Sequence, residues 1–366
     1  MGVKTITLPN GRIIGDGQPA FIVGEIGQNH QGDRVTAGQL IELAWTAGCD
    51  AAKLTKRDVR SDLTAEAYNR PYEGPQSFGA TYGEHREKLE LSRFCLENIA
   101  NRVRLNPAGL FFTACDIASV ELLEEVFSPD LYKVASRDID NIPLIEHIAK
   151  TGKPVVLSTG FAGVYYPHDL EDACDAIRKH HDDIVMLYCV SKYPTPDEDI
   201  ALRNIERLRQ RLDVLVGFSD HTIGIHLGVA AVQVGACVIE KHITLARANK
   251  GTDHAASLEP EALGRYVRNI RAIEAAMARD TEPVLPDDQT VERLGRSLVT
   301  RRPITPGEVV TEEMLTLKSP GDGTRWHERE TVIGNAPLVR IEADTTIDGA
   351  PCLRAWPDTS PDSNKE

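Results

Sequence analysis

The chain has 366 residues, of which 41% are hydrophobic, 5% aromatic and 26% charged. This length allows two domains, or one large barrel with a smaller appendage. The 41 basic and 55 acidic residues give a formal net charge of −14, and a surface of that sign repels nucleic-acid phosphates and anionic lipid. We therefore expect no nucleic-acid partner and no membrane partner. An anionic small molecule would need a local group of cations.

The cysteines and the N-terminal segment indicate a cytoplasmic protein. The seven cysteines are scattered, odd in number and without a CxxC pair, so we expect reduced thiols. No apolar run approaches the ~20 residues of a membrane-spanning helix. The first segment, MGVKTITLPNGRIIGDG, lacks the apolar core of a secretory signal.

Eight short apolar runs recur along the first three quarters of the chain. They are residues 21–26, 51–55, 110–115, 131–136, 154–159, 184–190, 214–219 and 237–244. Uninterrupted apolar runs of this length are typical of parallel strands buried on both faces. Stretches of helical period lie between them, for example 34–48, 119–127, 144–152 and 225–236. Eight such units predict an α/β fold of the TIM (β/α)8 barrel type. A doubly wound open sheet is the alternative that alternation alone leaves open.

Changes in composition divide the chain. We assign residues 1–280 to the barrel domain, with a short β extension at 1–19. Residues 281–293 are polar and read as a linker, and 294–354 contain short alternating pieces that predict a small β-rich domain. Residues 355–366 are polar and are expected to form a disordered tail.

One connection, between residues 55 and 110, is unusually long and contains the string YEGPQSFGATYGEH. Long connections in compact domains often carry function. We interpret this one as a lid or a loop that contacts substrate, with a surface insertion as the alternative.

Ionisable or hydroxyl residues stand near the ends of all eight predicted strands. They include Glu25, Lys53, Thr113, Lys133, Ser136, Ser158, Ser191, Tyr193, Ser219, His221, Glu240 and His242. In a barrel these strand ends carry the chemistry. Two lysines with several hydroxyls predict a cradle for phosphate and carboxylate groups. His221 and His242 follow adjacent strands and could share one divalent ion, although two histidines alone are a weak metal signal. Glu25 could serve as a ligand or a general base.

Longer strings occur in chain order between residues 21 and 260. They are FIVGEIGQNHQGD, SFGATYGEHREKLE, KVASRDIDNIPLIE, GKPVVLSTG, YPTPDEDIALR, GFSDHTIGIHLGVAAVQVGA, EKHITL and KGTDHAASLEP. They resemble the N-acetylneuraminate (sialic acid) synthase family, which are phosphoenolpyruvate-dependent nonulosonate synthases with a TIM barrel followed by an antifreeze-like (SAF) domain. The later string LGRSLVTRRPITPGEVVTEEMLTLK is similar to the start of that SAF domain. YGEH and KGTDHAASLEP look closer to the animal branch of the family.

The resemblance implies a role for each strand-end residue. Glu25, Lys53 and Lys133 would be catalytic, and His221 with His242 would hold a divalent metal, Mn²⁺ with Mg²⁺ or Co²⁺ as alternatives. Phosphoenolpyruvate would lie against Lys53, Thr113, Lys133, Ser136, Ser158, Ser191 and Ser219, and the sugar would contact Asp138, Tyr193 and Asp253. The SAF domain of one subunit would cover the barrel of its partner in a domain-swapped homodimer.

Four departures from the family pattern fall mainly where the sugar would bind. Thr55 replaces a usual Gln, Arg137 a Gly, Val190 a Thr, and Ser319 stands where bacterial members carry an Arg. We expect condensation of phosphoenolpyruvate with an open-chain acylamino aldose like N-acetylmannosamine. Arg137 motivates the alternative of a sister synthase that uses another aldose or a sugar 6-phosphate. A further alternative is an inactive sugar-binding homologue, against which the presence of the metal histidines argues.

Overall fold

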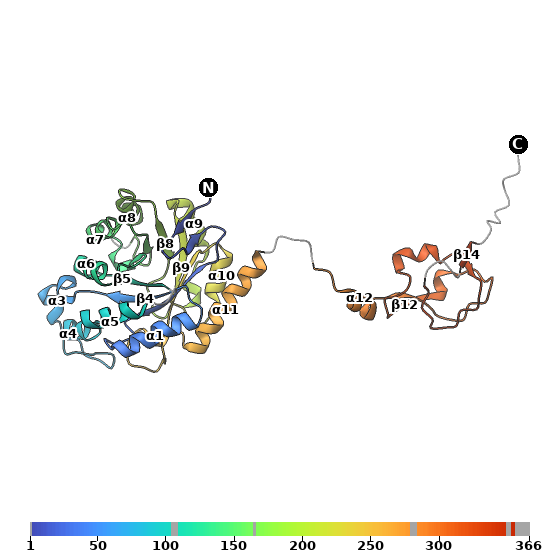
Figure 1. Ribbon diagram of the computed structural model, residues 1–366, viewed down its shortest axis with the longest axis horizontal. Helices are drawn as coiled ribbons and strands as arrows, with labels where there is room; N and C mark the ends of the chain where they lie inside the picture. Colours follow the sequence, from blue (N-terminus) through green and yellow to red (C-terminus); the bar gives the residue numbers. More distant parts are fainter. Residues whose placement is uncertain (1, 104–108, 164–165, 279–283, 349–352, 356–366) are drawn as a thin grey trace. The chain divides into compact units, whose positions relative to one another are not determined.

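The structure, a computed structural model, describes residues 2–103, 109–163, 166–278, 284–348 and 353–355. The chain forms two compact units, Met1–Arg279 and Asp280–Glu366 (Figure 1).

The first unit is built on a closed barrel of eight parallel strands. These are β3 (Phe21–Gly27), β4 (Ala51–Lys56), β5 (Gly109–Ala114), β6 (Tyr132–Val134), β7 (Val155–Ser158), β8 (Ile184–Tyr188), β9 (Leu215–Asp220) and β10 (Val238–His242). They pair in sequence order, and β10 closes the ring on β3. The predicted TIM barrel is therefore confirmed, and the open-sheet alternative is excluded.

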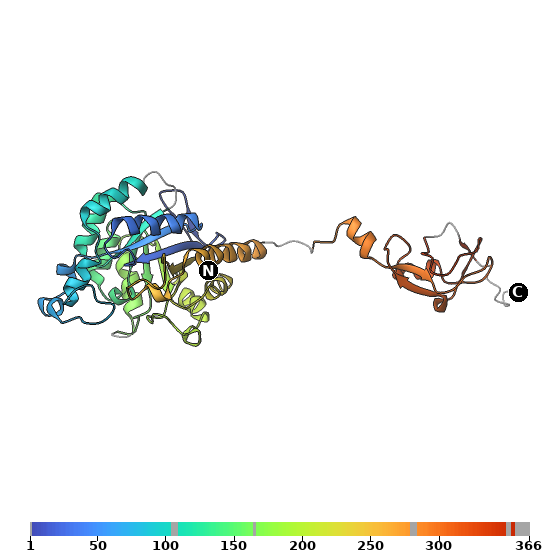
Figure 2. The same cartoon turned by 90° about the horizontal axis from the view of Figure 1, so that it is seen from below.

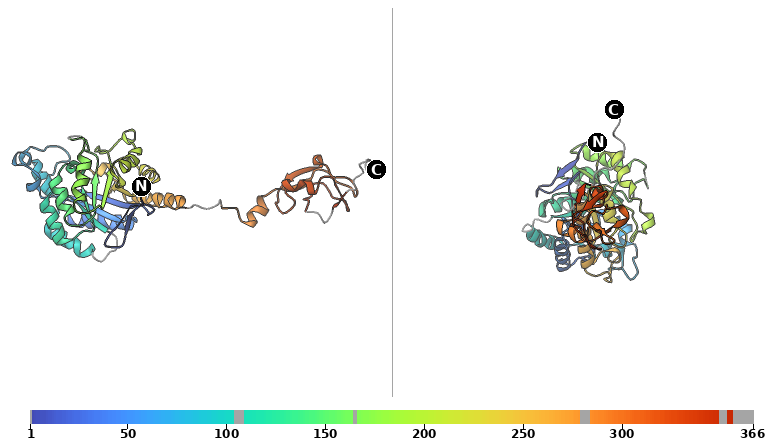
Figure 3. Two further views of the ribbon diagram at one scale, coloured as in Figure 1. Left: turned by 90° about the horizontal axis from the view of Figure 1, so that it is seen from above. Right: turned by 90° about the vertical axis from the view of Figure 1, so that its right-hand side faces the viewer.

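Helices follow the strands and surround the barrel (Figures 2 and 3). They are α1 (Arg34–Thr46), α6 (Ile117–Val126), α7 (Ile142–Ala149), α8 (Asp169–Arg178), α9 (Arg203–Leu212), α10 (Leu227–Gln233) and α11 (Pro260–Met277). Short 3-10 turns occur at Ser136–Asp138, Asp197–Asp199 and His254–Ala256. Asp33 and Asp116 cap α1 and α6 by accepting backbone N–H bonds, which satisfies donors that a helix start leaves open.

The strands alternate between two apolar layers. Ile22 and Ile26 of β3 pack in a core with α1 residues such as Leu40, whereas Phe21 and Val23 belong to a second cluster. The second cluster contains residues from one face of the other strands, together with Ile6, Leu8 and Ile14 of the N-terminal segment. The segment forms a hairpin of β1 (Thr5–Thr7) and β2 (Ile13–Gly15). Since side chains alternate along a strand, the next residues on the inner face of β3 and β4 are Glu25 and Lys53.

The long connection between β4 and β5 is mostly helical. It contains α2 (Val59–Asp62), α3 (Ala65–Asn69), α4 (Tyr82–Lys88) and α5 (Arg93–Val103). Its middle part contacts the loop after β10: the Gly251 N–H donates to Gln76 Oε1 at 2.5 Å, and Lys250 donates to the Ser77 carbonyl. This segment thus supports a loop that carries Asp253.

The second unit contains short antiparallel pairs. β11 (Ser297–Thr300) pairs with β12 (Leu315–Lys318), and β13 (Asn335–Pro337) with β14 (Leu353–Ala355). Short 3-10 turns lie at Glu312–Met314 and Trp326–Thr331. A small core includes Leu298, Ile304, Val310, Leu315 and Val332.

The segment expected as a linker before this unit is partly helical. Part of the segment expected as a linker forms helix α12 (Asp288–Leu294), which Asp287 caps by accepting from the Thr290 N–H. The expected tail, apart from Ala355, lies outside the described residues. Among the helices that the structure describes, none is both long and apolar enough to cross a membrane.

Candidate active site

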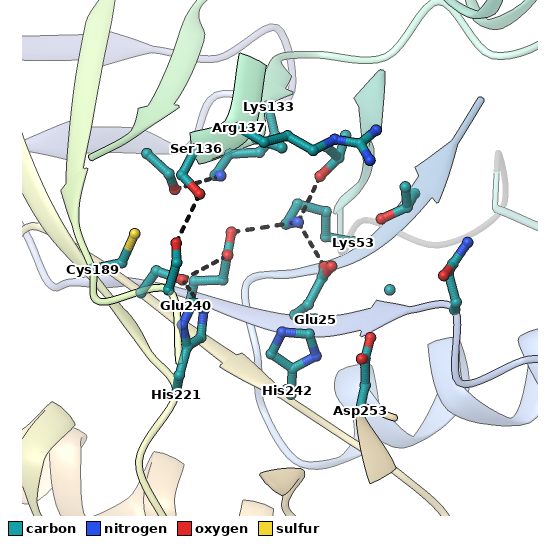
Figure 4. Close-up of a pocket in the computed structure, with 18 of the residues that line it drawn as sticks. Glu25, Lys53, Lys133, Ser136, Arg137, Cys189, His221, Glu240, His242 and Asp253 are labelled. Atoms are coloured by element: carbon teal, nitrogen blue, oxygen red, sulfur yellow. Dashed lines mark hydrogen bonds and ion pairs between the residues drawn. The ribbon is translucent and has the colours of Figure 1, made fainter. Parts of the chain in front are cut away.

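A cavity of about 420 Å³ opens at the carboxyl ends of the barrel strands (Figure 4). Twelve of the thirteen sequence-predicted site residues line it: Glu25, Lys53, Thr113, Lys133, Ser136, Ser158, Ser191, Tyr193, Ser219, His221, His242 and Asp253. They come from all eight strands or from the loops that follow them. The strand period places them together, because each strand points its last inner-face residues into the same space.

The floor of the cavity holds a buried group of alternating charges. Lys53 Nζ lies 2.7 Å from Glu25 Oε2 and 3.6 Å from Glu240 Oε2, and it donates to Thr113 Oγ1 at 2.7 Å. Figure 4 shows the Lys53 ammonium between the two carboxylates. Lys133 Nζ donates instead to Ser158 Oγ at 2.6 Å and to the Val134 carbonyl.

These charges shift one another's proton affinities. Burial raises the pKa of Glu25, while the Lys53 ammonium opposes that rise. Burial acts on Glu240 in the same direction, but Lys53 and Lys133 outweigh it and lower the pKa of Glu240 to about 2. Burial lowers the pKa of Lys133. Glu240 is therefore the fixed negative charge of the floor, and Glu25 is the carboxylate whose proton affinity is raised.

Hydroxyl groups from separate strand ends converge beside Lys133. Ser136 Oγ and Ser191 Oγ are 3.1 Å apart, and Ser219 Oγ donates to Glu240 Oε1 at 2.9 Å. A side chain at Gly160 would collide with Ser191. The close approach of the β7 loop to this serine therefore requires glycine.

The imidazoles of His221 and His242 form one wall of the cavity. Their ring centroids are 5.7 Å apart, and the Tyr193 ring stacks on the His221 ring with centroids separated by 4.1 Å. His221 Nδ1 lies 2.7 Å from the Val190 carbonyl, and that contact fixes the ring. Burial and the neighbouring His242 lower the pKa of His221 to about 4, so this imidazole is neutral at physiological pH.

The arrangement offers donors that suit a divalent metal, although it does not form a closed protein site. His242 Nδ1 is buried and has no hydrogen-bond partner among the described residues. A Cβ at Gly27 would lie 3.2 Å from Glu25 Oε1, 3.4 Å from Asp253 Oδ2 and 3.6 Å from His242 Cε1, so these groups surround a small empty space. Within the described part of the chain, no three His, Cys, Asp or Glu side chains form a metal-binding cluster. The donor types therefore fit a metal that takes its remaining ligands from water or substrate.

Two of the three residues expected to contact sugar line the cavity, and the third does not. Tyr193 and Asp253 line the cavity, whereas Asp138 is not among its lining residues. The chain turns in a 3-10 helix at this point, and the Asp138 carboxylate lies 3.4 Å from Arg137 Nε. Asp138 therefore contacts a lining residue instead of the cavity itself.

Of the four positions that depart from the family pattern, two line the cavity. Thr55 and Arg137 line the cavity, while Val190 contributes its carbonyl to His221. Ser319 lies in the second unit, where its hydroxyl donates to the Gly295 carbonyl at 2.9 Å.

Comparisons with known proteins identify the family to which the chain belongs. The model of the NeuB family matches residues 40–282, and the SAF domain model matches residues 295–350. The chain is 37% identical to the N-acetylneuraminate-9-phosphate synthase of Homo sapiens, with 92% of this chain and 94% of that protein covered. The chain belongs to the NeuB family. The predicted family membership is thus confirmed.

Other NeuB-family relatives differ in the product for which they are named. The chain is 32% identical to the N,N'-diacetyllegionaminic acid synthase of Campylobacter jejuni, over 89% of this chain and 98% of that one. Among solved structures, it is similar to the N-acetylneuraminic acid (sialic acid) synthetase of Leptospira borgpetersenii, with 29% identity and a TM-score of 0.66. That match covers 79% of this chain and 94% of the Leptospira chain.

The cavity contains further residues to which the sequence analysis assigned no role. Glu240 stands two positions before His242 on β10, so the two side chains lie on the same face of the strand. From this spacing the position of Glu240 could have been predicted. Gln28, Arg57 and Arg86 also line the cavity. The two arginines lie in or beside the long connection, where no periodic pattern places a side chain. The long connection therefore contributes cationic side chains to the cavity.

Proposed function

We propose that the chain condenses phosphoenolpyruvate with an open-chain acylamino aldose like N-acetylmannosamine, giving a nonulosonic acid and phosphate. Membership of the NeuB family and the names of its relatives support a phosphoenolpyruvate-dependent nonulosonate synthase. The observation that carries the proposal is a pair of buried lysines beside two imidazoles in one strand-end cavity. In a chain of net charge −14, such a pair is a local site for a small anion.

Phosphoenolpyruvate is proposed to lie over Lys53 and Lys133. An ammonium group binds phosphate or carboxylate as a compact charge, and Thr113 and the serine hydroxyls beside it supply hydrogen bonds. Glu240 balances part of the lysine charge when substrate is absent, since Lys53 Nζ is 3.6 Å away. Charge-assisted hydrogen bonds of this kind are roughly twice as strong as neutral ones.

His221 and His242 are proposed to hold the divalent metal, with Mn²⁺ first and Mg²⁺ or Co²⁺ as alternatives. When bound, such an ion supplies Lewis-acid polarisation of a carbonyl oxygen. The low pKa of His221 keeps its imidazole neutral, which is the form that binds metals. Tyr193 packs on the His221 ring and limits its rotation.

Glu25 is proposed as the general base. C3 of phosphoenolpyruvate forms a carbon–carbon bond to the aldehyde carbon, whose oxygen takes up a proton from solvent. Water then adds at C2 of the former phosphoenolpyruvate, and its proton passes to the Glu25 carboxylate. Phosphate departs with the bridging oxygen by cleavage of the C2–O bond, while the C2 hydroxyl gives up its proton to the departing phosphate and becomes the keto group. Burial raises the pKa of Glu25, which makes this carboxylate a better proton acceptor than Glu240, whose pKa is lowered to about 2.

An isotope experiment tests this proposal. The full chain is incubated with Mn²⁺, N-acetylmannosamine and phosphoenolpyruvate carrying ¹⁸O at the bridging position. We expect the label in the released phosphate and a solvent oxygen at C2 of the product. Label retained in the sugar acid would contradict C–O cleavage, and the absence of condensation with every acceptor tested would contradict the function.

Relatives of the chain differ in whether the product for which they are named carries a phosphate. The human relative is named for a 9-phosphate product, whereas the Campylobacter relative is named for a product without phosphate. A synthase acting on a sugar 6-phosphate is therefore a second candidate.

We also propose a cytoplasmic homodimer in which the SAF domain of one subunit covers the barrel of the other. Light scattering of the full chain tests the dimer. Mixing a barrel-site variant with a chain truncated after the barrel tests whether the second unit acts on a partner.

A further inference from the structure

Three arginines line the cavity, and they differ in how their charge is balanced. Arg57 Nε lies 3.2 Å from Glu90 Oε1, and Arg57 Nη1 lies 3.5 Å from Asp62. Arg137 contacts the carboxylates of Asp62 and Asp138, each at 3.4 Å. Both guanidinium groups therefore face carboxylates of the protein.

Arg86 has only neutral partners. Its Nη1 donates to Gln28 Oε1 at 2.6 Å, and its Nε donates to the Tyr82 hydroxyl at 2.9 Å. Among the residues that the structure describes, no carboxylate lies within 4.0 Å of its guanidinium nitrogens. A half-buried positive charge on the cavity wall is thus left without a counter-charge. Such a group favours an anion from outside the chain.

Gln28 supplies a second, independent observation. Its Oε1 accepts the Arg86 hydrogen bond, which fixes the orientation of the amide. Its Nε2 is buried and has no hydrogen-bond partner among the described residues. Because Gln28 also lines the cavity, an unused N–H donor and an unbalanced guanidinium stand side by side. A buried donor of this kind is costly unless a ligand accepts from it.

The position of this pair separates it from the lysines of the floor. Gln28 directly follows Gly27, whose missing Cβ borders Asp253 and His242. It therefore lies on the side proposed for sugar. Arg86 is held there by helix α4, whose first turn is fixed by a capping box between Thr81 and Glu84.

We propose that Arg86 and Gln28 form a phosphate subsite for the acceptor, so that the chain prefers an acylamino aldose phosphorylated at the end remote from the aldehyde. This inference rests on the proposed function and names its substrate class. A guanidinium fork with an adjacent amide N–H matches the oxygens of a phosphate. Arg137, which faces two carboxylates already, is not the residue that selects the acceptor.

The test compares acceptors in matched variants of the full chain. With phosphoenolpyruvate saturating, kcat/KM is measured for N-acetylmannosamine, its 6-phosphate and its C6 carboxylate. The wild type should favour the 6-phosphate. Arg86→Gln should lower kcat/KM for the 6-phosphate by roughly 10- to 100-fold, mainly through KM. It should lower the value for N-acetylmannosamine by a smaller factor, since that acceptor carries no phosphate for the guanidinium to bind.

Three further variants sharpen the result. Lys88→Gln removes the same charge from an exposed position of the same helix and should leave both acceptors unaffected. Arg86→Lys keeps the charge but loses the fork, so it should retain part of the preference. Gln28→Glu places a carboxylate beside Arg86 and should abolish the preference. Thermal melting checks that each variant is folded.

Calorimetric binding of N-acetylmannosamine 6-phosphate separates this inference from the proposed function. If no acceptor is turned over, the proposed function fails. Arg86-dependent binding of the 6-phosphate would then still support the subsite, and equal binding by wild type and Arg86→Gln would overturn it. Equal kcat/KM for the two acceptors in the wild type, equal losses for both in Arg86→Gln, or preference for the C6 carboxylate would also overturn it.

Discussion

Lys53 and Glu25 form a buried ion pair across neighbouring strands, with Nζ 2.7 Å from Oε2. The two residues are partners in the parallel register of β3 and β4, so the backbone itself sets their proximity. Burial raises the proton affinity of Glu25, and the Lys53 ammonium opposes that effect. The cation proposed to face the substrate anion therefore also controls the proposed base.

The acid limb of the pH–rate profile should report Glu25. Because burial raises its pKa above the ordinary value of 4.5, kcat/KM should fall as the pH decreases through a point above 4.5, where the base becomes protonated. His221 cannot produce this limb, since its pKa of about 4 keeps it neutral there. Glu25→Gln should lower kcat by roughly 10²- to 10⁴-fold, and its residual activity should lack the limb. An unchanged limb in that variant would reject Glu25 as the base.

Replacement of Lys53 should weaken binding of phosphoenolpyruvate. Lys53→Met should raise the KM for this substrate by roughly 10- to 100-fold, because a charge-assisted hydrogen bond contributes about 1.5–3 kcal/mol. Steady-state kinetics at saturating acceptor measure the effect. Lys150→Met, at an exposed position beyond α7, is the control.

Removal of the Lys53 ammonium also leaves Glu25 and Glu240 without a shared cation, so the melting temperature should fall. Lys53→Arg keeps the charge and separates loss of fold from loss of binding. An unchanged KM in folded Lys53→Met would show that phosphoenolpyruvate binds elsewhere.

The histidine pair should determine metal binding. His221→Ala and His242→Ala should each lose bound Mn²⁺ on dialysis and lose metal-dependent turnover, while the melting curve keeps its shape. Metal content by atomic absorption and turnover after EDTA treatment are the measurements. His327→Ala removes an imidazole from the exposed surface of the second unit, where its side chain is 78% exposed, and should behave as wild type. Full activity of the double variant in EDTA would refute the assignment.

The barrel and most of its site could be predicted from the sequence because strand period determines both. The runs that contain Glu25, Lys53 and His242 bury their earlier residues, and the alternation then directs these three side chains inward. Arg86 and Gln28 could not be placed, because their proximity depends on how the long connection folds back over the end of β3. The position of Asp138 outside the lining follows from a 3-10 turn, which no periodicity indicates.

Gly27 should be required for activity beyond its effect on stability. Its φ of 55° is left-handed, and a Cβ would lie 3.2 Å from Glu25 Oε1 and 3.4 Å from Asp253 Oδ2. Gly27→Ala should therefore displace the Glu25 carboxylate, fill the space beside Asp253 and His242, lower kcat and weaken metal binding. Gly11 is a matched control, because its φ is 84° and a Cβ there meets nothing within 4 Å. Both alanine variants should lose about 1–2 kcal/mol of stability from the left-handed backbone, as thermal melting would record. Only Gly27→Ala should lose turnover, and wild-type kinetics in that variant would show that the space beside Glu25, Asp253 and His242 is not used in the reaction.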